Sequence, residues 1–435
     1  MSIPLQKIQE WNIVNKNIPL QNAVTQNDLS RLIVNWKTSS LHTFDFNHQI
    51  EPEAKVTNQK SSGRCWMFAG LNVLRINFMK KHNLPKDFEF SQTHLFFYDK
   101  LERANTFLNQ IIANKDKDIN DRYIQHLLEG PLGDGGYWHT FANLVNKYGL
   151  VPKTVHPETV HSSATARMNF VLDFQLRQYA KQLREADDNL DELKNKCLEE
   201  YHRLLCLFLG TPVSYFDWKY TDKEGKYQMK EALTPKEFYK MGDWDVNDFI
   251  TLTNDPRNSY DTKMKMDFIG NIHGTNDVVY YNTTMDELIK WSKKSIMESV
   301  PVWHGCDVRK WLDVNKDMMD LDIVNYNDLL GVKFNLNKKE RMEYGISSPT
   351  HAMTFVGFES KDDTKEMLKW KVENSWSSIG PNSGYYGMSH AWFKEYVYEV
   401  VIPKWVMDKD TLEKIEKCEK VVELPAWDIM GNRLD

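Results

Sequence analysis

A chain of 435 residues with 41% hydrophobic and 27% charged residues has the composition of an ordinary globular protein with room for two or three domains. Its net charge of −6 gives little overall attraction for phosphate, which argues against a nucleic-acid-binding protein. Met1 to Lys16 lacks an apolar run long enough for a signal peptide or a membrane anchor, and the five cysteines are scattered, so we expect a cytoplasmic protein without a membrane partner.

The first half of the chain is predicted to be mainly helical. Residues 1–50 are polar with short helical patterns and would form an arm. Beyond them, the run from Met67 to Met79 predicts a helix that is apolar nearly all round and therefore buried. A second helix is predicted around Thr93 to Ala113, followed by a glycine-rich loop from Gly130 to Trp138. Apolar residues from Phe170 to Leu209 again recur at helical spacing.

The second half of the chain is predicted to contain most of the strands. Val213 to Met229 predicts a hairpin whose turn contains Gly225. Four further segments have the composition of strands, and they are 300–308, 351–358, 367–373 and 396–402. The sequence therefore predicts an α+β protein with a helical half and a β half.

Four residues in or near these segments supply what acyl transfer by a thiol requires. Cys65 stands at the start of the buried helix, where unpaired N–H groups and the macrodipole favour a thiolate. Gln59 can donate its side-chain N–H to the oxyanion, beside the backbone N–H of Cys65. His351 can carry the proton to the leaving amine. Asn374 can hold the imidazole without adding a charge.

Simpler explanations exist for several of these features. A single cysteine at a helix start is more often a core residue than a nucleophile, but the conjunction of Cys65 with Asn374-Ser375-Trp376 favours catalysis. His304 and Cys306 lack two further ligands at metal spacing, so neither a metal nor another cofactor is expected. The loop from Gly130 to Trp138 has no phosphate-binding pattern, and a turn explains it as well as a binding site does.

Several motifs surround the four candidate catalytic residues. Ser62-Gly63-Arg64-Cys65-Trp66 fits the papain pattern, with Ser62 where secreted members carry a disulfide cysteine. The other motifs are Val56-Thr57-Asn58-Gln59-Lys60, Cys65-Trp66-Met67-Phe68-Ala69, Thr350-His351-Ala352-Met353, Trp370-Lys371-Val372-Glu373-Asn374-Ser375-Trp376 and Ala426-Trp427-Asp428. Together they resemble the bleomycin hydrolase and bacterial aminopeptidase C branch of the papain-like cysteine peptidases over nearly the whole chain.

The resemblance implies a cysteine peptidase that acts on short peptides, most often as an aminopeptidase. It assigns the catalytic triad to Cys65, His351 and Asn374 and the oxyanion donor to Gln59. Trp376 would shield the hydrogen bond between His351 and Asn374 from water, and Trp66 would follow the nucleophile as a supporting residue.

The same resemblance implies how the substrate is bound. The backbone of Asp134, Gly135 and Gly136 would pair with bound peptide, because glycine allows close approach. The carboxyl-terminal residue, Asp435, would meet the substrate's α-ammonium inside the cleft and so restrict cleavage to single amino-terminal residues. Assembly as a homohexamer with the sites facing an inner chamber would exclude folded proteins.

The spacing of the motifs predicts an insertion. Cys65 and His351 are 286 positions apart, whereas small papain-like enzymes have roughly 130 to 150, so about half of the interval must be inserted structure. The resemblance implies a two-lobed papain-like fold, with a helical lobe, an antiparallel β lobe and a large, mainly helical insertion. The predicted divisions are the arm 1–50, the helical lobe with the nucleophile 51–150, the insertion for oligomerisation 151–272, the β lobe with His351 and Asn374 273–422, and the tail directed to the active-site cleft 423–435.

The carboxyl-terminal tail departs from the pattern of that branch. Ile429 replaces a proline, the chain is one residue longer after Gly431, and both Arg433 and Asp435 are charged. Because proline fixes the backbone direction, its loss would allow the terminal carboxylate to shift. A smaller departure is Ser377, which stands where glycine is usual.

Three functions therefore remain open on the sequence. A cysteine aminopeptidase is favoured, and an oligopeptide endopeptidase on the same scaffold is the alternative that the altered tail suggests. A nucleic-acid-binding ring is disfavoured by the net charge of −6. Cleavage that requires a free α-amino group distinguishes the first from the second, and salt-dependent retention on a phosphate matrix would support the third.

Overall fold

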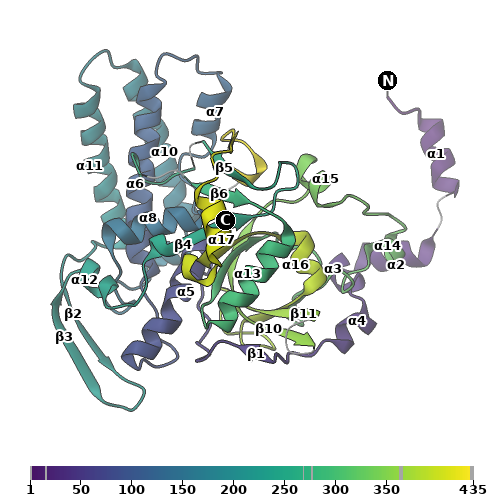
Figure 1. The fold of residues 1–435 in the computed structure, drawn as a ribbon. Helices are drawn as coiled ribbons and strands as arrows, with labels where there is room; N and C mark the ends of the chain where they lie inside the picture. The colour runs from purple at the N-terminus through teal and green to yellow at the C-terminus, as the bar shows by residue number, and fades with distance from the viewer. Residues whose placement is uncertain (1, 15–16, 268, 276–277, 362–365, 432–435) are drawn as a thin grey trace.

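The structure, a computed structural model, describes residues 2–14, 17–267, 269–275, 278–361 and 366–431. Its α-helices are α1 (Leu5–Val14), α2 (Ile18–Gln26), α3 (Leu29–Leu32), α4 (Trp36–Leu41), α5 (Cys65–His82), α6 (Gln92–Ala113), α7 (Arg122–Glu129), α8 (Trp138–Tyr148), α9 (Val160–Ser163), α10 (Ala166–Glu185), α11 (Leu190–Leu209), α12 (Pro235–Lys240), α13 (Met285–Met297), α14 (Tyr326–Leu330), α15 (Lys338–Glu343), α16 (His390–Tyr396) and α17 (Lys409–Glu416). In Figure 1, α6, α7, α10 and α11 gather on one side of the molecule, and the sheet with α13 and α16 lies on the other.

Most strands of the described chain form one twelve-stranded sheet. The strands are β1 (His48–Gln49), β2 (Phe216–Thr221), β3 (Tyr227–Leu233), β4 (Phe249–Thr253), β5 (Thr262–Met266), β6 (Val279–Asn282), β7 (Val302–Cys306), β8 (Leu312–Asp313), β9 (Met318–Met319), β10 (His351–Lys361), β11 (Glu366–Glu373), β12 (Tyr385–Ser389), β13 (Val397–Pro403) and β14 (Val421–Leu424). The order across the sheet is β14-β5-β6-β4-β13-β7-β10-β11-β12-β9-β8, with β1 paired to β10. Within it, the pairs β14–β5, β6–β4 and β12–β9 are parallel and the other pairs are antiparallel.

The sheet is covered on both faces around β10. Successive side chains of a strand point to opposite faces. Thr354 donates through Oγ1 to the carbonyl of Ala69 on α5, at 3.4 Å. The next residue, Phe355, stacks on Phe393 of α16 with ring centroids 5.3 Å apart. Helix α5 is therefore buried against one face of β10, as its apolar sequence predicts, while α16 covers the other face.

The four segments predicted as strands are confirmed as β7, β10, β11 and β13, and the predicted hairpin is β2 and β3. The predicted buried helix is confirmed as α5, and the second predicted helix as α6. The region 170–209, where apolar residues recur at helical spacing, forms two helices, α10 and α11, that pack together. The chain turns between them at Asn189, whose φ of 56° is left-handed. Asparagine tolerates that conformation better than most residues, and apolar periodicity carries no sign of it.

The predicted boundaries at residues 272 and 422 separate strands that belong to one sheet. The interval 151–272 contains β4 and β5, which lie in the same large sheet as β10 and β11. The predicted boundary at 422 also falls inside β14, which pairs with β5. Strand pairing therefore continues across both of these divisions. No helix within the described ranges is long and apolar enough to cross a membrane.

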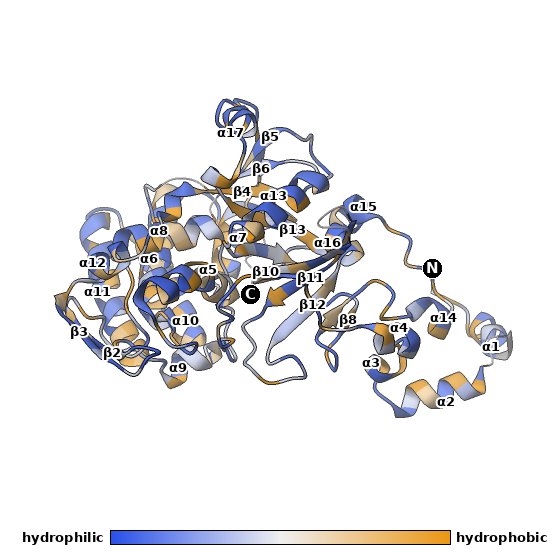
Figure 2. Ribbon diagram, turned by 60° about the horizontal axis from the view of Figure 1, so that its bottom comes forward, coloured by the Kyte–Doolittle hydropathy of each residue, from blue (hydrophilic) through white to orange (hydrophobic). Residues whose placement is uncertain are grey.

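Helices α1 and α2 of the amino-terminal arm lie outside the packed body, whereas Ile33 and Ile50 of the same arm are buried. Helices α1 and α2 extend away from the sheet in Figures 1 and 2, and β1 joins the arm to β10 through the pair His48 and Phe358. No residue of α2 is buried. Large apolar side chains of the arm are exposed to solvent, and these are Ile3, Leu5, Ile8, Trp11, Ile18, Trp36 and Leu41.

Candidate active site

Cys65 is the first residue of α5 and is fully buried. Its sulfur accepts a hydrogen bond of 3.4 Å from the backbone N–H of Ala352 on β10. Ala352 directly follows His351, so the helix and the strand that carry the two predicted catalytic residues meet at the thiol. The helix amino terminus lies at the sulfur, where its free N–H groups favour negative charge.

His351 is held by Asn374. The imidazole Nε2 lies 2.8 Å from Asn374 Oδ1, and that oxygen also accepts the backbone N–H of Ser375 at 2.8 Å. Because an amide oxygen only accepts, Nε2 carries the ring proton and Nδ1 is left with a lone pair. Burial lowers the pKa of His351 to about 4, against the hydrogen bond to Asn374, which favours the charged form. The imidazole is therefore neutral near pH 7 and able to accept a proton.

Gln59 lies directly beside this pair. Its backbone N–H donates to the carbonyl of Ser375 at 2.8 Å, and its side-chain Oε1 accepts the hydroxyl of Ser375 at 2.5 Å. Its Nε2 donates to the carbonyl of Ser62 at 2.6 Å and retains a second N–H. The structure thus brings Gln59 next to the strand end that carries Asn374, although 315 positions separate them in sequence.

The two predicted supporting tryptophans occupy different positions. Trp376 lies against the imidazole of His351, with ring centroids 4.9 Å apart and the planes inclined by 36°. Trp66 is fully buried, and its indole N–H donates to the carbonyl of Asp134 at 2.7 Å. Trp376 therefore covers the imidazole of His351, whereas Trp66 connects α5 to the glycine-rich loop.

The predicted substrate-binding stretch is bonded mainly to the protein itself. Asp134 is buried, with its carboxylate bonded to Lys100 at 2.6 Å. The carbonyl of Gly135 accepts a hydrogen bond of 2.7 Å from Arg103. A Cβ at Gly136 would lie 2.7 Å from the ring of Trp66, so this glycine permits close packing on the indole. Pairing of this stretch with a bound peptide stays a prediction, and the predicted contact of Asp435 lies outside the described residues.

Sequence reasoning assigned no role to Ser375, yet it orients Gln59 through both backbone and hydroxyl. The motif Asn374-Ser375-Trp376 contains the signal, because a short polar residue between two predicted site residues is available for such a bond. The hydrogen bond from the backbone N–H of Ala352 to the Cys65 sulfur was not predicted either, because a backbone donor does not depend on the residue type.

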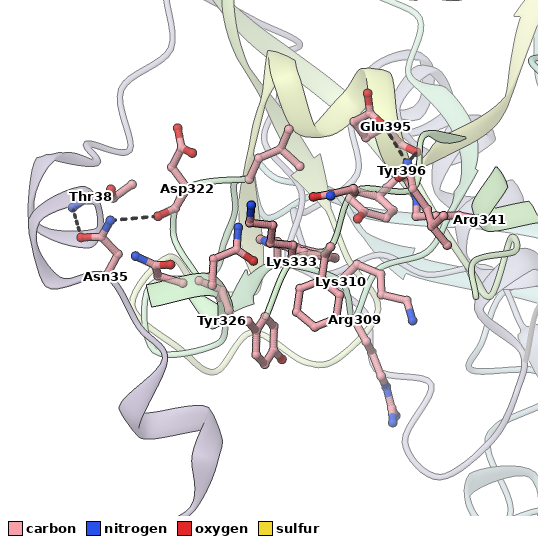
Figure 3. A pocket seen from close by; sticks show the side chains of 18 of the residues that line it. Asn35, Thr38, Arg309, Lys310, Asp322, Tyr326, Lys333, Arg341, Glu395 and Tyr396 are labelled. Carbon is pink, nitrogen blue, oxygen red and sulfur yellow. Dashed lines mark hydrogen bonds and ion pairs between the residues drawn. The ribbon is translucent and has the colours of Figure 1, made fainter. Parts of the chain in front are cut away.

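Other candidate sites are separate from this one. Among the described residues, no three His, Cys, Asp or Glu side chains are arranged to hold a metal ion. His304 is buried and stacks on Phe355 with centroids 3.7 Å apart. A cavity of about 1020 Å³ lies between the arm and the chain around α14, and none of the four predicted catalytic residues lines it. Figure 3 shows the side chains of its walls. Its walls include Trp311, Tyr326 and Phe334.

Comparisons with known proteins agree over the whole chain. A sequence profile of the Peptidase C1-like family matches residues 5–431. Bleomycin hydrolase of Rattus norvegicus is 38% identical over 440 residues, which cover 98% of this chain and 96% of the rat protein. Aminopeptidase C of Listeria innocua is 36% identical over 430 residues, which cover 98% and 96% of the two chains. The crystal structure of PepW from Lactobacillus rhamnosis has a TM-score of 0.94 and 33% identity, with 99% of both chains covered.

The match to PepW extends the papain-like relationship from the motifs to the fold, which mixes helices and sheet. Several relatives are named aminopeptidases, which supports exopeptidase over endopeptidase activity. The chain belongs to the Peptidase C1-like family, in the branch of bleomycin hydrolase and the bacterial aminopeptidases, and is a cysteine-type peptidase.

Proposed function

We propose that this protein is a cysteine aminopeptidase that removes amino-terminal residues from short peptides, with Cys65 as nucleophile. The observation that carries the proposal is the convergence of Cys65, the strand start at His351 and the amide of Asn374. The thiol is fully buried, its sulfur accepts the backbone N–H of the residue that follows His351, and the imidazole of His351 is bonded to Asn374. This arrangement is the one that thiol-based acyl transfer requires.

The reaction proceeds in two halves. His351 takes the proton of the Cys65 thiol on Nδ1, and the thiolate attacks the carbonyl carbon of the first peptide bond. The resulting oxyanion is bound by the Nε2 of Gln59 and the backbone N–H of Cys65. The tetrahedral intermediate collapses as His351 gives its proton to the leaving amine. Water, deprotonated by His351, then attacks the thioester and releases the amino acid and the thiol.

The carboxyl-terminal tail supports the aminopeptidase assignment. Met430 is buried, and its carbonyl lies 3.5 Å from the hydroxyl of Tyr137. Tyr137 directly follows Gly136, so the described part of the tail runs to the stretch predicted to bind substrate. Arg257 anchors this part through Asp428, at 2.8 Å and 3.2 Å. A tail in this position would occupy the non-prime side of the cleft, despite the replacement of proline by Ile429.

One peptide pair tests the proposal. The purified protein is given the same short peptide with a free and with an acetylated amino terminus, and Cys65→Ala serves as the inactive control. We expect release of the first residue from the free peptide and no cleavage of the acetylated one. Internal cleavage of the acetylated peptide would identify an endopeptidase on the same scaffold. Equal activity of Cys65→Ala and wild type would refute the mechanism.

The resemblance also supports a cytoplasmic homohexamer, which is part of the proposal. The apolar side chains exposed on α1 and α2 are available for contacts between copies. Sedimentation of the purified chain at several concentrations measures the assembly. A monomer at all concentrations would refute the hexamer without touching the catalytic assignment.

A further inference from the structure

One peptide group links Gln59 to Asp134. The carbonyl of Ser62 accepts a hydrogen bond of 2.6 Å from Gln59 Nε2. The N–H of the same peptide unit, from Gly63, donates to Asp134 Oδ2 at 3.2 Å. The Ser62–Gly63 peptide therefore lies between the predicted oxyanion donor on one side and a carboxylate on the other.

The carboxylate of Asp134 has no capacity left for another donor. An ionised carboxylate offers about four lone-pair sites. Oδ1 accepts Lys100 Nζ at 2.6 Å and Asn169 Nδ2 at 2.8 Å, and Oδ2 accepts Thr165 Oγ1 at 2.5 Å in addition to Gly63. Burial by itself raises the pKa of Asp134, but the charge of Lys100 and these hydrogen bonds outweigh it and hold the pKa well below its ordinary value. The side chain is thus a fixed, ionised acceptor and is not available to bind substrate.

The strip between Gln59 and Cys65 is also held from the side of α9 and α10. The backbone N–H of Ser61 donates to the carbonyl of Ser163 at 3.0 Å, and the carbonyl of Ser61 accepts the backbone N–H of Thr165 at 3.2 Å. Arg64, fully buried, forms two hydrogen bonds with Glu158, at 3.0 Å and 2.8 Å. The papain pattern has a disulfide cysteine at the position of Ser62, and here noncovalent contacts hold the same strip.

We propose that Asp134 is a positioning residue of the oxyanion site, acting on Gln59 through the Ser62–Gly63 peptide. An acceptor charge on the N–H end of a peptide strengthens the acceptor at its carbonyl end, since linked hydrogen bonds polarise one another. Asp134 therefore fixes the side-chain amide of Gln59 and leaves its second N–H directed to the substrate. The inference rests on the proposed role of Gln59 as oxyanion donor.

The test removes the charge without leaving a buried ammonium unpaired. The double variant Lys100→Met with Asp134→Asn is compared with wild type for peptide hydrolysis and for alkylation of Cys65 by iodoacetamide. Alkylation forms no oxyanion, so it reports the thiol alone. We expect kcat to fall about tenfold or more, less than the loss of a whole oxyanion donor, and alkylation to stay within about twofold. An equal fall in alkylation would overturn the inference, because the whole nucleophile strip would then have moved.

A matched control lies on α6, two residues after Lys100. Glu102 is buried like Asp134 and is bonded to Lys147 and Tyr148, without contact to the strip. Glu102→Gln should leave kcat unchanged. Thr165→Val provides a second variant that keeps the ion pair and removes one of the donors, and we expect a kcat several-fold lower with alkylation unchanged. Unchanged kcat in both the double variant and Thr165→Val would overturn the inference.

A mutant cycle with Gln59→Ala distinguishes positioning of Gln59 from a general loosening of the site. In the Gln59→Ala background, the change at Lys100 and Asp134 should lower kcat by less than about threefold, because the group through which it acts is gone. The full tenfold effect in that background would overturn the inference while leaving the proposed function intact. Normal kcat for Gln59→Ala alone would instead refute the oxyanion assignment itself.

Discussion

Replacing Glu399 with glutamine should make the protein more stable in alkaline solution. Glu399 lies on β13 with 1% of its surface exposed, and neither carboxyl oxygen has a hydrogen-bond partner among the described residues. Its side chain lies over Gly305 of β7, where a Cβ would be 2.5 Å from Oε1. Burial raises the pKa of Glu399 to about 8 and the pKa of the neighbouring Tyr280 well above its ordinary value.

The size of the effect on the free energy of unfolding follows from the pKa of Glu399 in the folded and unfolded chain. In the unfolded chain this carboxyl ionises near its ordinary value of 4.5, and in the folded chain near 8. Between these values the folded state holds about one proton more, so the free energy of unfolding falls by ~1.4 kcal/mol per pH unit. The stability is fully present below 4.5 and is lost as the pH rises through 8. From about pH 5 to about pH 8 the loss is about 4 kcal/mol.

Urea denaturation at about pH 5, 6.5 and 8 measures the effect. We expect Glu399→Gln to flatten the decline of stability with pH, so that the variant exceeds wild type most at the highest value. Glu423→Gln is the control, because Glu423 is an exposed carboxyl on β14 of the same sheet. If the free energy of unfolding falls equally with pH in wild type and Glu399→Gln, ionisation of this carboxyl does not cause the loss of stability.

Three further substitutions have defined outcomes. Asn374→Ala should lower kcat by about tenfold to a hundredfold, less than Cys65→Ala does, because Asn374 orients the base and does not react. Steady-state kinetics measures both losses, and equal losses would contradict this order. Arg75→Met should destabilise the fold by about 3–5 kcal/mol in urea, because it leaves Glu373 buried without its ion-pair partner, and adding Glu373→Gln should recover most of the loss. Ser377→Gly should raise the melting temperature, because the φ of Ser377 is 81° and a left-handed residue other than glycine costs about 1–2 kcal/mol, partly offset by the flexibility of glycine. A lower melting temperature would contradict that account.

The sequence predicts those features that depend on local pattern. The apolar run after Cys65 predicts α5, because a helix that is buried on all sides has apolar residues at nearly every position. The predicted strand segments agree with β7, β10, β11 and β13 within a few positions, and β13 is especially rich in β-branched residues. The motifs around Cys65, His351 and Asn374 predict the proposed site, because thiol chemistry requires those residue types.

Other features depend on contacts that no local pattern records. The break at Asn189 is a single left-handed residue inside a helical periodicity. The strands β4 and β5 join the large sheet through pairings with β6, β13 and β14, so their membership depends on tertiary structure. The environment of Asp134 is built from Lys100 on α6 and Asn169 on α10, and only the folded chain brings these together.

The contacts that hold the strip before Cys65 have a consequence for biosynthesis. Ser61 is bonded to Ser163 and Thr165, which leave the ribosome long after it. A growing chain therefore contains Cys65 before these hydrogen bonds can form, and before His351 and Asn374 have been translated. Until Asn374 has been translated, the nascent chain therefore lacks part of its predicted catalytic set.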